Sequence, residues 1–432
     1  MSDYHVWNPT QGISRKLNAG TDITLTEVGD ALVVAASSSG SGVTSGATLP
    51  ASPEDGALHL HTPTGRTILM QYNGSSWGPI LSYGTMTIYV DGTSGTDDQE
   101  KGFGTGTDAY ATIQYAIDQM PGNLGGAVLC YVAAGTYVES IVLQGKASST
   151  TANINFYGEL SLQETVTSAT VSAGSGATQG TVTKAGAFTG DSYANLLAYF
   201  VTDGEYRLID SHTDDTLTLV GTAPSSTSQN IEIYDWATVL QGLFLAQYNT
   251  VSTVFYYLSI ENGADLYTLG LSGGCVINVF YSKLISDSST AVIIPQVNAR
   301  LITTGCYIEN TGTNAVGISM RTFSDATMRQ TKLYAGAALG ANRRGISSIG
   351  STSYSLQQGC IIDDWDYGTN SGGNDVVTIF NNSSTGYIIV RNCNVTGLYA
   401  DTGAQISGTT NNVYSGNTAD ETAVSGSYGY ID

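Results

Sequence analysis

The sequence predicts an all-β protein in which short parallel strands wind into a coil, a solenoid that one short helix covers at its N-terminal end. The first observation is composition: Gly is abundant (52 residues), Tyr outnumbers Phe by 27 to 9, and only 12% of the residues are charged. Such a composition favours strands and turns over long helices. The second is a single amphipathic helical segment that short apolar strands follow directly. The third is a strand motif that recurs in the C-terminal half with a period of roughly 23 to 33 residues, as expected of a solenoid.

The predicted coil begins with a strand at residues 86–91, where β-branched and polar side chains alternate before a turn. Asp108 is a candidate N-cap for the helix that follows, and Pro121 ends that helix. The apolar face of the helix has helical spacing and comprises Ile113, Ala116, Ile117 and Met120. Further strands are expected at residues 128–132, 141–143 and 154–157. A helix laid across the first rung would protect its open edge from aggregation.

This stretch, with the motifs VDGTSGTDD, ATIQYAID, GGAVLCYVAAGTYVE and NINFYGE, resembles the start of a pectate-lyase-like right-handed parallel β-helix. In particular it resembles the versions carried by bacteriophage tailspikes and tail fibres. The resemblance implies a right-handed parallel β-helix over about the C-terminal four-fifths of the chain. It also implies a virion protein that contacts phage tail or capsid proteins through its N-terminus and that binds bacterial surface polysaccharide.

Pattern and composition divide the chain into six segments. The expected segments are an N-terminal virion-attachment β segment (1–36), a Gly/Ser linker (37–50), a small β module (51–83), the β-helix start with its capping helix (84–158), an inserted β subdomain (159–237), and the β-helix rungs with a C-terminal tail (238–432). The small N-terminal modules have too few apolar residues for independent cores. Trimerisation or docking must therefore complete these cores, and we expect a homotrimer.

The insertion is predicted where the rung spacing is lost, over residues 160–236, which contain several strands joined by turns. We interpret it as a small β-barrel-like subdomain. Its Tyr193, Tyr206 and His212 would either touch a glycan or pack the insert, and packing is the favoured interpretation.

The charge and the cysteines limit the classes of partner. A net charge of -21 argues against nucleic acid and anionic membranes, both of which require basic surfaces. The N-terminal residues form no apolar signal core, and no window is apolar enough to span a membrane. We therefore expect synthesis in the host cytoplasm and release within a virion. The five cysteines include no Cys-x-x-Cys pair, so neither a disulfide framework nor a zinc site is predicted, and no cofactor is expected.

Aligning the copies of the recurring motif gives three columns, each made of the residues at one equivalent position in successive rungs. The apolar column comprises Ile260, Ile285, Ile308, Tyr334, Ile362 and Val395. The next comprises Glu261, Ser286, Glu309, Ala335, Asp363 and Thr396. The third, expected at turns with φ > 0, comprises Asn262, Asp287, Asn310, Gly336, Asp364 and Gly397. Cys306, Cys360 and Cys393 are expected to form an inward stack.

The carboxylate column supplies candidate catalytic residues: Glu261, Glu309 and Asp363. Two rung spacings would separate Glu261 from Glu309 by roughly 9–10 Å. Inverting glycosidases use a similar separation between their acid and their base. No cation neighbours either residue in this alignment. The alternative interpretation is that these acids only solvate a turn.

The segment DDWDYG supplies candidate ligand-binding residues: Asp364, Trp365, Asp366 and Tyr367. Aromatic rings stack on sugar rings while carboxylates accept hydroxyl protons. The alternative is a solvated loop in which Trp365 packs against a neighbouring chain.

His59 and His61 alternate with leucines, so we expect both imidazoles on the polar face of one strand. Three chains around an axis could bring six such nitrogens to one transition metal. The alternative is two exposed histidines on a short strand, without a metal.

We expect the protein to be a tail fibre or spike that recognises a host cell-surface glycan during adsorption. One alternative is a depolymerase, either a glycosidase or a lyase, that cleaves surface polysaccharide. The lyase chemistry that the resemblance implies requires clustered aspartates and a nearby base. The arginines do not lie beside an aligned acid cluster, so no lyase residue is assigned. The other alternative is a structural decoration protein of the tail or capsid that binds no ligand.

Overall fold

The computed structural model describes residues 43–335 apart from nine short gaps (63–66, 149–151, 175–178, 190–191, 225–227, 264–266, 288–289, 313–315 and 322–323). Outside that span it describes strands only. The chain forms two compact units. Unit 1 comprises Met1–Gly135, Leu143–Tyr157 and Gln247–Thr253, and unit 2 comprises Thr136–Val142, Gly158–Ala246 and Val254–Asp432. No helix in the described residues is long and apolar enough to cross a membrane.

Unit 1 contains a six-stranded sheet in the order β14-β10-β8-β7-β6-β5. Its strands are β5 (Thr44–Gly46), β6 (Leu58–His61), β7 (Thr67–Tyr72), β8 (Trp77–Tyr83), β10 (Asn123–Leu124) and β14 (Ala147–Ser148). Asn73 forms the hairpin turn between β7 and β8, because its side-chain oxygen accepts from Ser75 N (3.0 Å) and Ser76 N (2.9 Å).

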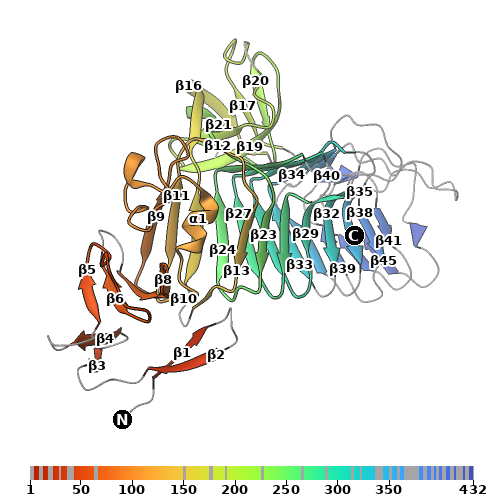
Figure 1. The fold of residues 1–432 in the computed structure, drawn as a ribbon. Coiled ribbons are helices and arrows are strands. Elements are labelled where there is room, and N and C mark those ends of the chain that lie inside the picture. Colours follow the sequence, from red (N-terminus) through yellow and green to blue (C-terminus); the bar gives the residue numbers. More distant parts are fainter. Residues whose placement is uncertain are drawn as a thin grey trace. The chain divides into compact units, whose positions relative to one another are not determined.

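Two antiparallel hairpins lie near the N-terminus of unit 1 (Figure 1). They pair β1 (Tyr4–Asn8) with β2 (Ile13–Leu17), and β3 (Ile23–Val28) with β4 (Ala31–Ala36). Both hairpins lie within residues 1–36, where the sequence predicted a β segment.

The coil starts in unit 1 as three parallel strands, β9 (Met86–Val90), β11 (Val128–Val132) and β15 (Asn153–Tyr157). Val128 pairs with both Met86 and Ile154, and all three side chains are buried. Helix α1 (Ile113–Asp118) has the predicted buried face. Its N-cap is Thr112, whose hydroxyl oxygen accepts from Tyr115 N (3.2 Å). The predicted cap, Asp108, instead belongs to a separate 3-10 turn, η1 (Gly106–Asp108), so that expectation was wrong.

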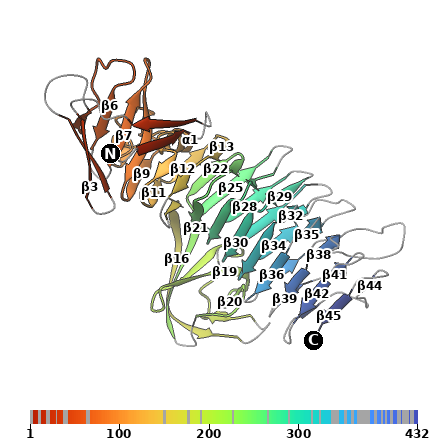
Figure 2. The same ribbon diagram turned by 90° about the horizontal axis from the view of Figure 1, so that it is seen from below.

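Unit 2 winds into three parallel sheets, and the predicted parallel β-helix is confirmed (Figures 1 and 2). The first sheet contains β22 (Thr238–Gln241), β25 (Leu258–Asn262), β28 (Lys283–Ser286), β31 (Tyr307–Asn310), β34 (Lys332–Ala335), β37 (Ile361–Asp363), β40 (Asn394–Val395) and β43 (Val413–Tyr414). The second contains β26 (Leu269–Ser272), β29 (Ala291–Pro295), β32 (Val316–Arg321), β35 (Arg344–Ile349), β38 (Ile379–Asn382), β41 (Leu398–Ala400) and β44 (Thr422–Ala423).

The third sheet of unit 2 contains β27 (Val276–Phe280), β30 (Arg300–Thr304), β33 (Asp325–Arg329), β36 (Ser353–Gln357), β39 (Tyr387–Val390), β42 (Gln405–Gly408) and β45 (Tyr428–Ile431). Four strands cross a boundary between the sequence segments of the two units: β12 (Gly135–Tyr137), β13 (Ile141–Gln144), β23 (Phe244–Gln247) and β24 (Ser252–Tyr256).

The register of the first sheet corrects the predicted columns. Its inward column comprises Ile260, Leu284, Ile308 and Leu333, all buried, so the predicted Ile285 and Tyr334 were one residue out of step. A shift of one residue moves a side chain to the opposite face. Consequently Ile285, and not Ser286, lies between Glu261 and Glu309, and Tyr334, and not Ala335, follows Glu309.

The predicted φ > 0 column was also wrong for the members that the structure describes. Asn262, Asp287 and Asn310 are not among the residues with positive φ. Asn262 and Asn310 are buried strand ends, and the Asn310 amide donates to Thr290 O (3.1 Å) and Val316 O (3.0 Å). Of the predicted cysteine stack, Cys306 is buried, and burial raises the pKa of its thiol to about 12. Cys360 and Cys393 lie outside the described residues.

The predicted inserted β subdomain is confirmed as a closed antiparallel barrel in the order β16-β17-β20-β19-β18-β21 (Figure 1). Its strands are β16 (Leu160–Ser172), β17 (Thr181–Thr183), β18 (Leu197–Phe200), β19 (Glu205–His212), β20 (Thr216–Leu219) and β21 (Gln229–Trp236). Tyr193 packs in the barrel core, edge-on to Phe188 and His212. Tyr193 and His212 therefore have the packing role that the sequence favoured.

Candidate functional site

In the part of unit 2 where the corners are described, each rung turns from the third sheet to the first at a residue with positive φ. In four successive rungs this residue is Tyr257 (61°), Tyr281 (49°), Gly305 (65°) and Gln330 (47°). Bulky residues rarely adopt this conformation. Here hydrogen bonds to the next rung hold it, because Tyr257 N donates to Phe280 O (3.3 Å) and Tyr281 N donates to Thr304 O (2.9 Å). The two corner tyrosines stack with 13° between their ring planes.

Gly305 provides the space that the ring of Tyr281 occupies. A Cβ atom at position 305 would lie 2.5 Å from Cδ1 of Tyr281 and 2.7 Å from Cε1. The φ of +65° is also a conformation that side chains disfavour. Glycine is therefore required here on two independent grounds.

The barrel is inserted at this same corner, one rung earlier. Gly158 N donates to Tyr256 O (2.8 Å), as the later corner residues do to their next rungs. At the other end of the insertion, Ala237 N donates to Glu159 O (2.9 Å). The chain therefore leaves and re-enters the coil at one place, which brings the barrel against the corner tyrosines.

Side chains of the barrel and the coil meet in what we call the tyrosine cluster. Tyr206 lies at its centre, with its ring centroid 5.3 Å from that of Tyr257, 5.4 Å from that of Tyr281 and 6.2 Å from that of Tyr234. All members except Tyr307 are partly exposed. The tyrosine cluster comprises Tyr206 and Tyr234 of the barrel and Tyr257, Tyr281, Tyr307 and Tyr334 of the coil. These tyrosines pack with Leu197, Leu208, Val220 and Trp236.

Two polar contacts fix the barrel against the coil beside the cluster. The indole N–H of Trp236 donates to Tyr281 O (2.7 Å). Lys332 of the coil forms an ion pair with Asp210 of the barrel (2.9 Å), and the two side chains are only 10% and 20% exposed. Because breaking such a largely buried pair would leave a charge without a partner, it resists separation of the barrel from the rungs.

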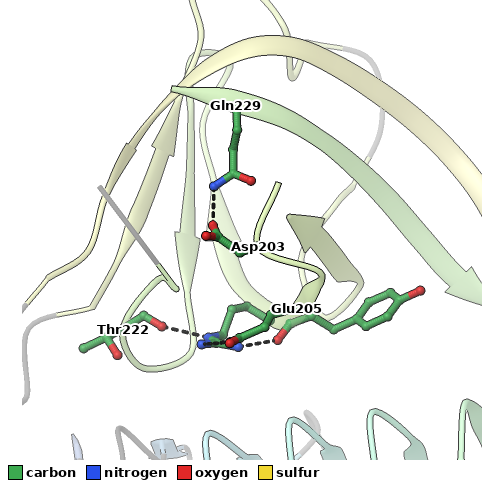
Figure 3. A network of polar contacts seen from close by, with 6 residues as sticks. Asp203, Glu205, Thr222 and Gln229 are labelled. Atoms are coloured by element: carbon green, nitrogen blue, oxygen red, sulfur yellow. Dashed lines mark hydrogen bonds and ion pairs between the residues drawn. The ribbon is translucent and has the colours of Figure 1, made fainter. Parts of the chain in front are cut away.

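Arg207 stabilises the strand that carries Tyr206, and Figure 3 labels two of its hydrogen-bond partners, Thr222 and Glu205. Its Nε donates to Thr222 O (2.9 Å), Nη1 to Tyr206 O (2.7 Å) and Nη2 to Glu205 Oε2 (2.7 Å). With its guanidinium largely buried, this arginine acts on the backbone and presents little charge to solvent.

Three carboxylates border the cluster, and each accepts a hydrogen bond from a neutral hydroxyl. Tyr234 Oη donates to Glu232 Oε2 (2.6 Å), and Ser259 Oγ donates to Glu261 Oε1 (2.9 Å). The hydroxyl of Tyr307 hydrogen-bonds to Glu309. Hydroxyls orient a carboxylate without neutralising it, so the acids keep acceptor capacity for a ligand.

Partial burial raises the pKa of several phenol groups in the cluster, which therefore stay protonated at neutral pH. Burial raises the pKa of Tyr206 and of Tyr234 to about 12, with nearby tyrosines and Glu232 adding to the effect. Burial also raises the pKa of Tyr257 and of Tyr307 above the usual range. Each phenol can therefore donate as well as accept a hydrogen bond.

The structure places the predicted catalytic acids on one sheet face without bringing them together. Glu261 and Glu309 both pair with Ile285, one on each side, so two strand spacings separate them. Asp363 continues the column next to Tyr334. Lys283 lies on the strand between the two glutamates, two residues before Ile285 and therefore on the same face. The predicted absence of a neighbouring cation was thus wrong, because it rested on the shifted register.

The other predicted site residues fall elsewhere. Trp365, Tyr367, Asp364 and Asp366 lie outside the described residues. His59 and His61 are both buried in unit 1, which corrects the expectation of a polar, exposed face. The His59 ring contacts Thr44 Oγ1 (2.6 Å) and Gly46 O (3.2 Å), and the two imidazole centroids are 6.0 Å apart. Within the described residues, no group of three potential metal ligands includes them.

Sequence reasoning named Tyr206 as a possible glycan contact and placed Tyr334 in the apolar column, but it singled out no other member of the tyrosine cluster. Two signals were present, namely the excess of Tyr over Phe and the adjacent pair Tyr256-Tyr257. What the sequence could not show is that the barrel packs on the rungs that follow it.

No protein-family model matches the sequence, and no curated protein matches it. Among solved structures, the chain is similar to the Gp54 tailspike of Acinetobacter baumannii bacteriophage AP22, which was solved in complex with A. baumannii capsular saccharide. The identity is 13% and the TM-score 0.25, over 70% of this chain and 63% of that one.

The chain is also similar to pectin methylesterase from Aspergillus niger, with 13% identity and a TM-score of 0.35 over 80% of this chain and 83% of that one. A third similar structure is the tailspike gp61 of Pseudomonas phage phi297, with 12% identity and a TM-score of 0.19 over 74% of this chain and 71% of that one. All three are β-helix proteins, and the likeness concerns the fold alone.

Proposed function

We propose that this protein is a bacteriophage tail fibre or tailspike that recognises a surface glycan of the host, with the tyrosine cluster as the binding surface. The observation that carries the proposal is the set of partly exposed tyrosines bordered by carboxylates that hydroxyls orient. Phenol rings present apolar faces to sugar C–H groups, and their hydroxyls exchange hydrogen bonds with sugar hydroxyls. Carboxylates add strong acceptors for the same groups.

The proposed assembly is a homotrimer whose N-terminus attaches to tail or capsid proteins of the virion. Support comes from the hairpins β1–β2 and β3–β4, each of which pairs only two strands in the described residues. Isolated two-stranded hairpins are marginally stable in water. Neighbouring chains or a virion protein would supply the missing partners.

A depolymerase is the second candidate, and one observation favours it. Glu261 and Glu309 share an outward sheet face two strand spacings apart, roughly 9–10 Å between backbones. An inverting glycosidase needs such a gap to admit a water molecule between its acid and its base. In this alternative, one glutamate protonates the leaving oxygen while the other activates the water.

Binding and cleavage are tested together on an array of bacterial capsular polysaccharides and lipopolysaccharides. Tyr206→Ala should weaken binding at least about tenfold, because it removes the ring at the centre of the cluster. The matched control is Tyr248→Ala, since Tyr248 is 62% exposed and lies in unit 1, outside the cluster. Equal binding by parent, Tyr206→Ala and Tyr248→Ala would refute the assigned surface.

Release of reducing ends during the same incubation distinguishes a depolymerase from an adhesin. Glu309→Gln should then abolish release by at least about a hundredfold while glycan remains bound. If neither binding nor release occurs with any glycan, the remaining function is a structural decoration protein.

A further inference from the structure

The carboxylates at the tyrosine cluster have neutral hydrogen-bond donors as partners. Glu232, Glu261 and Glu309 each accept from a tyrosine or serine hydroxyl, as described above. None of them forms an ion pair within the part of the chain that the structure describes. The face therefore presents three carboxylates on a chain whose formal net charge is already -21.

The nearby cations are, in contrast, engaged inside the protein. Arg207 directs its guanidinium to two backbone carbonyls and Glu205. Lys332 is paired with Asp210. Lys283 lies with its ammonium 5.9 Å from the centroid of the Trp236 ring, a cation–π contact. Its strand is also flanked by the strands of Glu261 and Glu309, close enough for long side chains to interact diagonally.

The carboxylates lie outside ion pairs in the described residues, whereas the nearby cations have partners within the protein. From this difference we infer that the tyrosine cluster binds a glycan without acidic groups, built from neutral or amino sugars. The inference rests on the proposed function and names the chemical class of its ligand. A carboxylate that accepts one hydrogen bond can accept others, so it suits a ligand that donates hydrogen bonds from hydroxyl or ammonium groups. A uronic acid or a sulfated sugar would instead place its anion among three carboxylates, where the nearby cations of the described residues already have partners. Like-charge repulsion would then cost binding free energy.

Lys283 provides the opposing possibility, because an acidic sugar could displace it from the indole and use it as a counter-ion. A neutral or cationic ligand and an acidic ligand predict different effects of the same substitutions on binding affinity. If the ligand is neutral or cationic, removing a carboxylate weakens binding and removing Lys283 does not abolish it. If the ligand is acidic, removing Lys283 abolishes binding and removing a carboxylate strengthens it.

The test compares matched probes, namely acidic capsular polysaccharides and the same polymers after chemical reduction of their carboxyl groups to alcohols. Neutral and N-deacetylated polysaccharides complete the set. We expect the full-length protein to bind a carboxyl-reduced polymer at least about tenfold more tightly than its acidic parent, and amino-bearing polymers with an affinity that falls as salt rises. Glu232→Gln should weaken binding of amino-bearing polymers, whereas Glu54→Gln, an exposed glutamate of unit 1, serves as the matched control.

The outcomes separate the inference from the function on which it rests. Tighter binding of the acidic parents, lost in Lys283→Gln, would overturn the inference and leave glycan recognition standing. Failure of every polymer to bind would overturn glycan recognition itself, and the inference with it.

Discussion

At the scale of single residues, Gly305 affects both the coil and the tyrosine cluster, because it lacks a Cβ atom. The ring of Tyr281 occupies the space that a Cβ at this position would take, and Tyr281 in turn accepts the indole hydrogen bond of Trp236. A change at 305 therefore acts on backbone conformation and on ring position together.

We predict that Gly305→Ala lowers the free energy of unfolding by about 2–4 kcal/mol, from a strained φ and from overpacking against Tyr281. Gly186→Ala is the matched control, because Gly186 has φ +62° but nothing within 4 Å of its added Cβ. That variant should lose only about 1 kcal/mol. Chemical denaturation of both variants measures the difference, and equal losses would contradict a role for the Tyr281 ring.

Residue-level prediction from the sequence succeeded for buried faces and failed for register. The helix face from Ile113 to Met120 was evident because apolar residues recur at helical spacing. At Leu284-Ile285 and Leu333-Tyr334, however, two adjacent residues could each fill the inward position, and the wrong one was chosen both times. The positive φ at the preceding corners, Tyr281 and Gln330, determines which residue points inward, and the sequence alone contains no φ.

At the scale of elements, the barrel is an insertion whose two ends meet. The hydrogen bond from Ala237 N to Glu159 O closes the coil beneath it. The insertion was predictable because the rung spacing disappears over residues 160–236. The face that it presents to the coil was not, since Tyr206, Tyr234 and Trp236 alternate with core residues as in any strand of a barrel.

We predict that replacing residues 160–236 by two glycines leaves the coil folded and removes glycan binding. The rungs keep the hydrogen bonds between their own strands. Loss of the barrel exposes Tyr307, which is 2% exposed in the intact protein. A modest decrease in thermal stability should accompany this exposure of apolar surface. Circular dichroism and the glycan array measure the two effects. A variant with normal binding, or one without β structure, would contradict this account.

At the scale of the whole molecule, assembly should follow from the two N-terminal hairpins. We predict that the full-length chain is a trimer at micromolar concentration, as measured by light scattering. Removal of residues 1–42 should lower the melting temperature of that trimer, because the hairpins would no longer bury their faces between chains. A full-length chain that stays monomeric at this concentration would count against the proposed assembly.

Alkaline pH should destabilise the protein through the partly buried tyrosines of the cluster. Unfolded tyrosines ionise near pH 10, whereas Tyr206 and Tyr234 do so only at about pH 12 in the folded chain. Between these values the folded state binds more protons than the unfolded state, so stability falls as pH rises. Below pH 10 the stabilisation is complete, and it is lost as the pH passes 12. Tyrosinate absorbance, followed together with circular dichroism, should show these phenols ionising only as the fold is lost.

The parallel ladders of unit 2 also determine how the coil bears tension. Hydrogen bonds between rungs run along the direction in which the rungs stack. A force applied along that direction therefore acts on every interface between successive rungs, and at each interface the three sheets share it. A linkage in series breaks at its weakest member. The two-residue strands β40, β43 and β44 give the shortest ladders of the C-terminal rungs. Under force the coil should therefore unravel from that end first, while the rungs beneath the barrel stay intact.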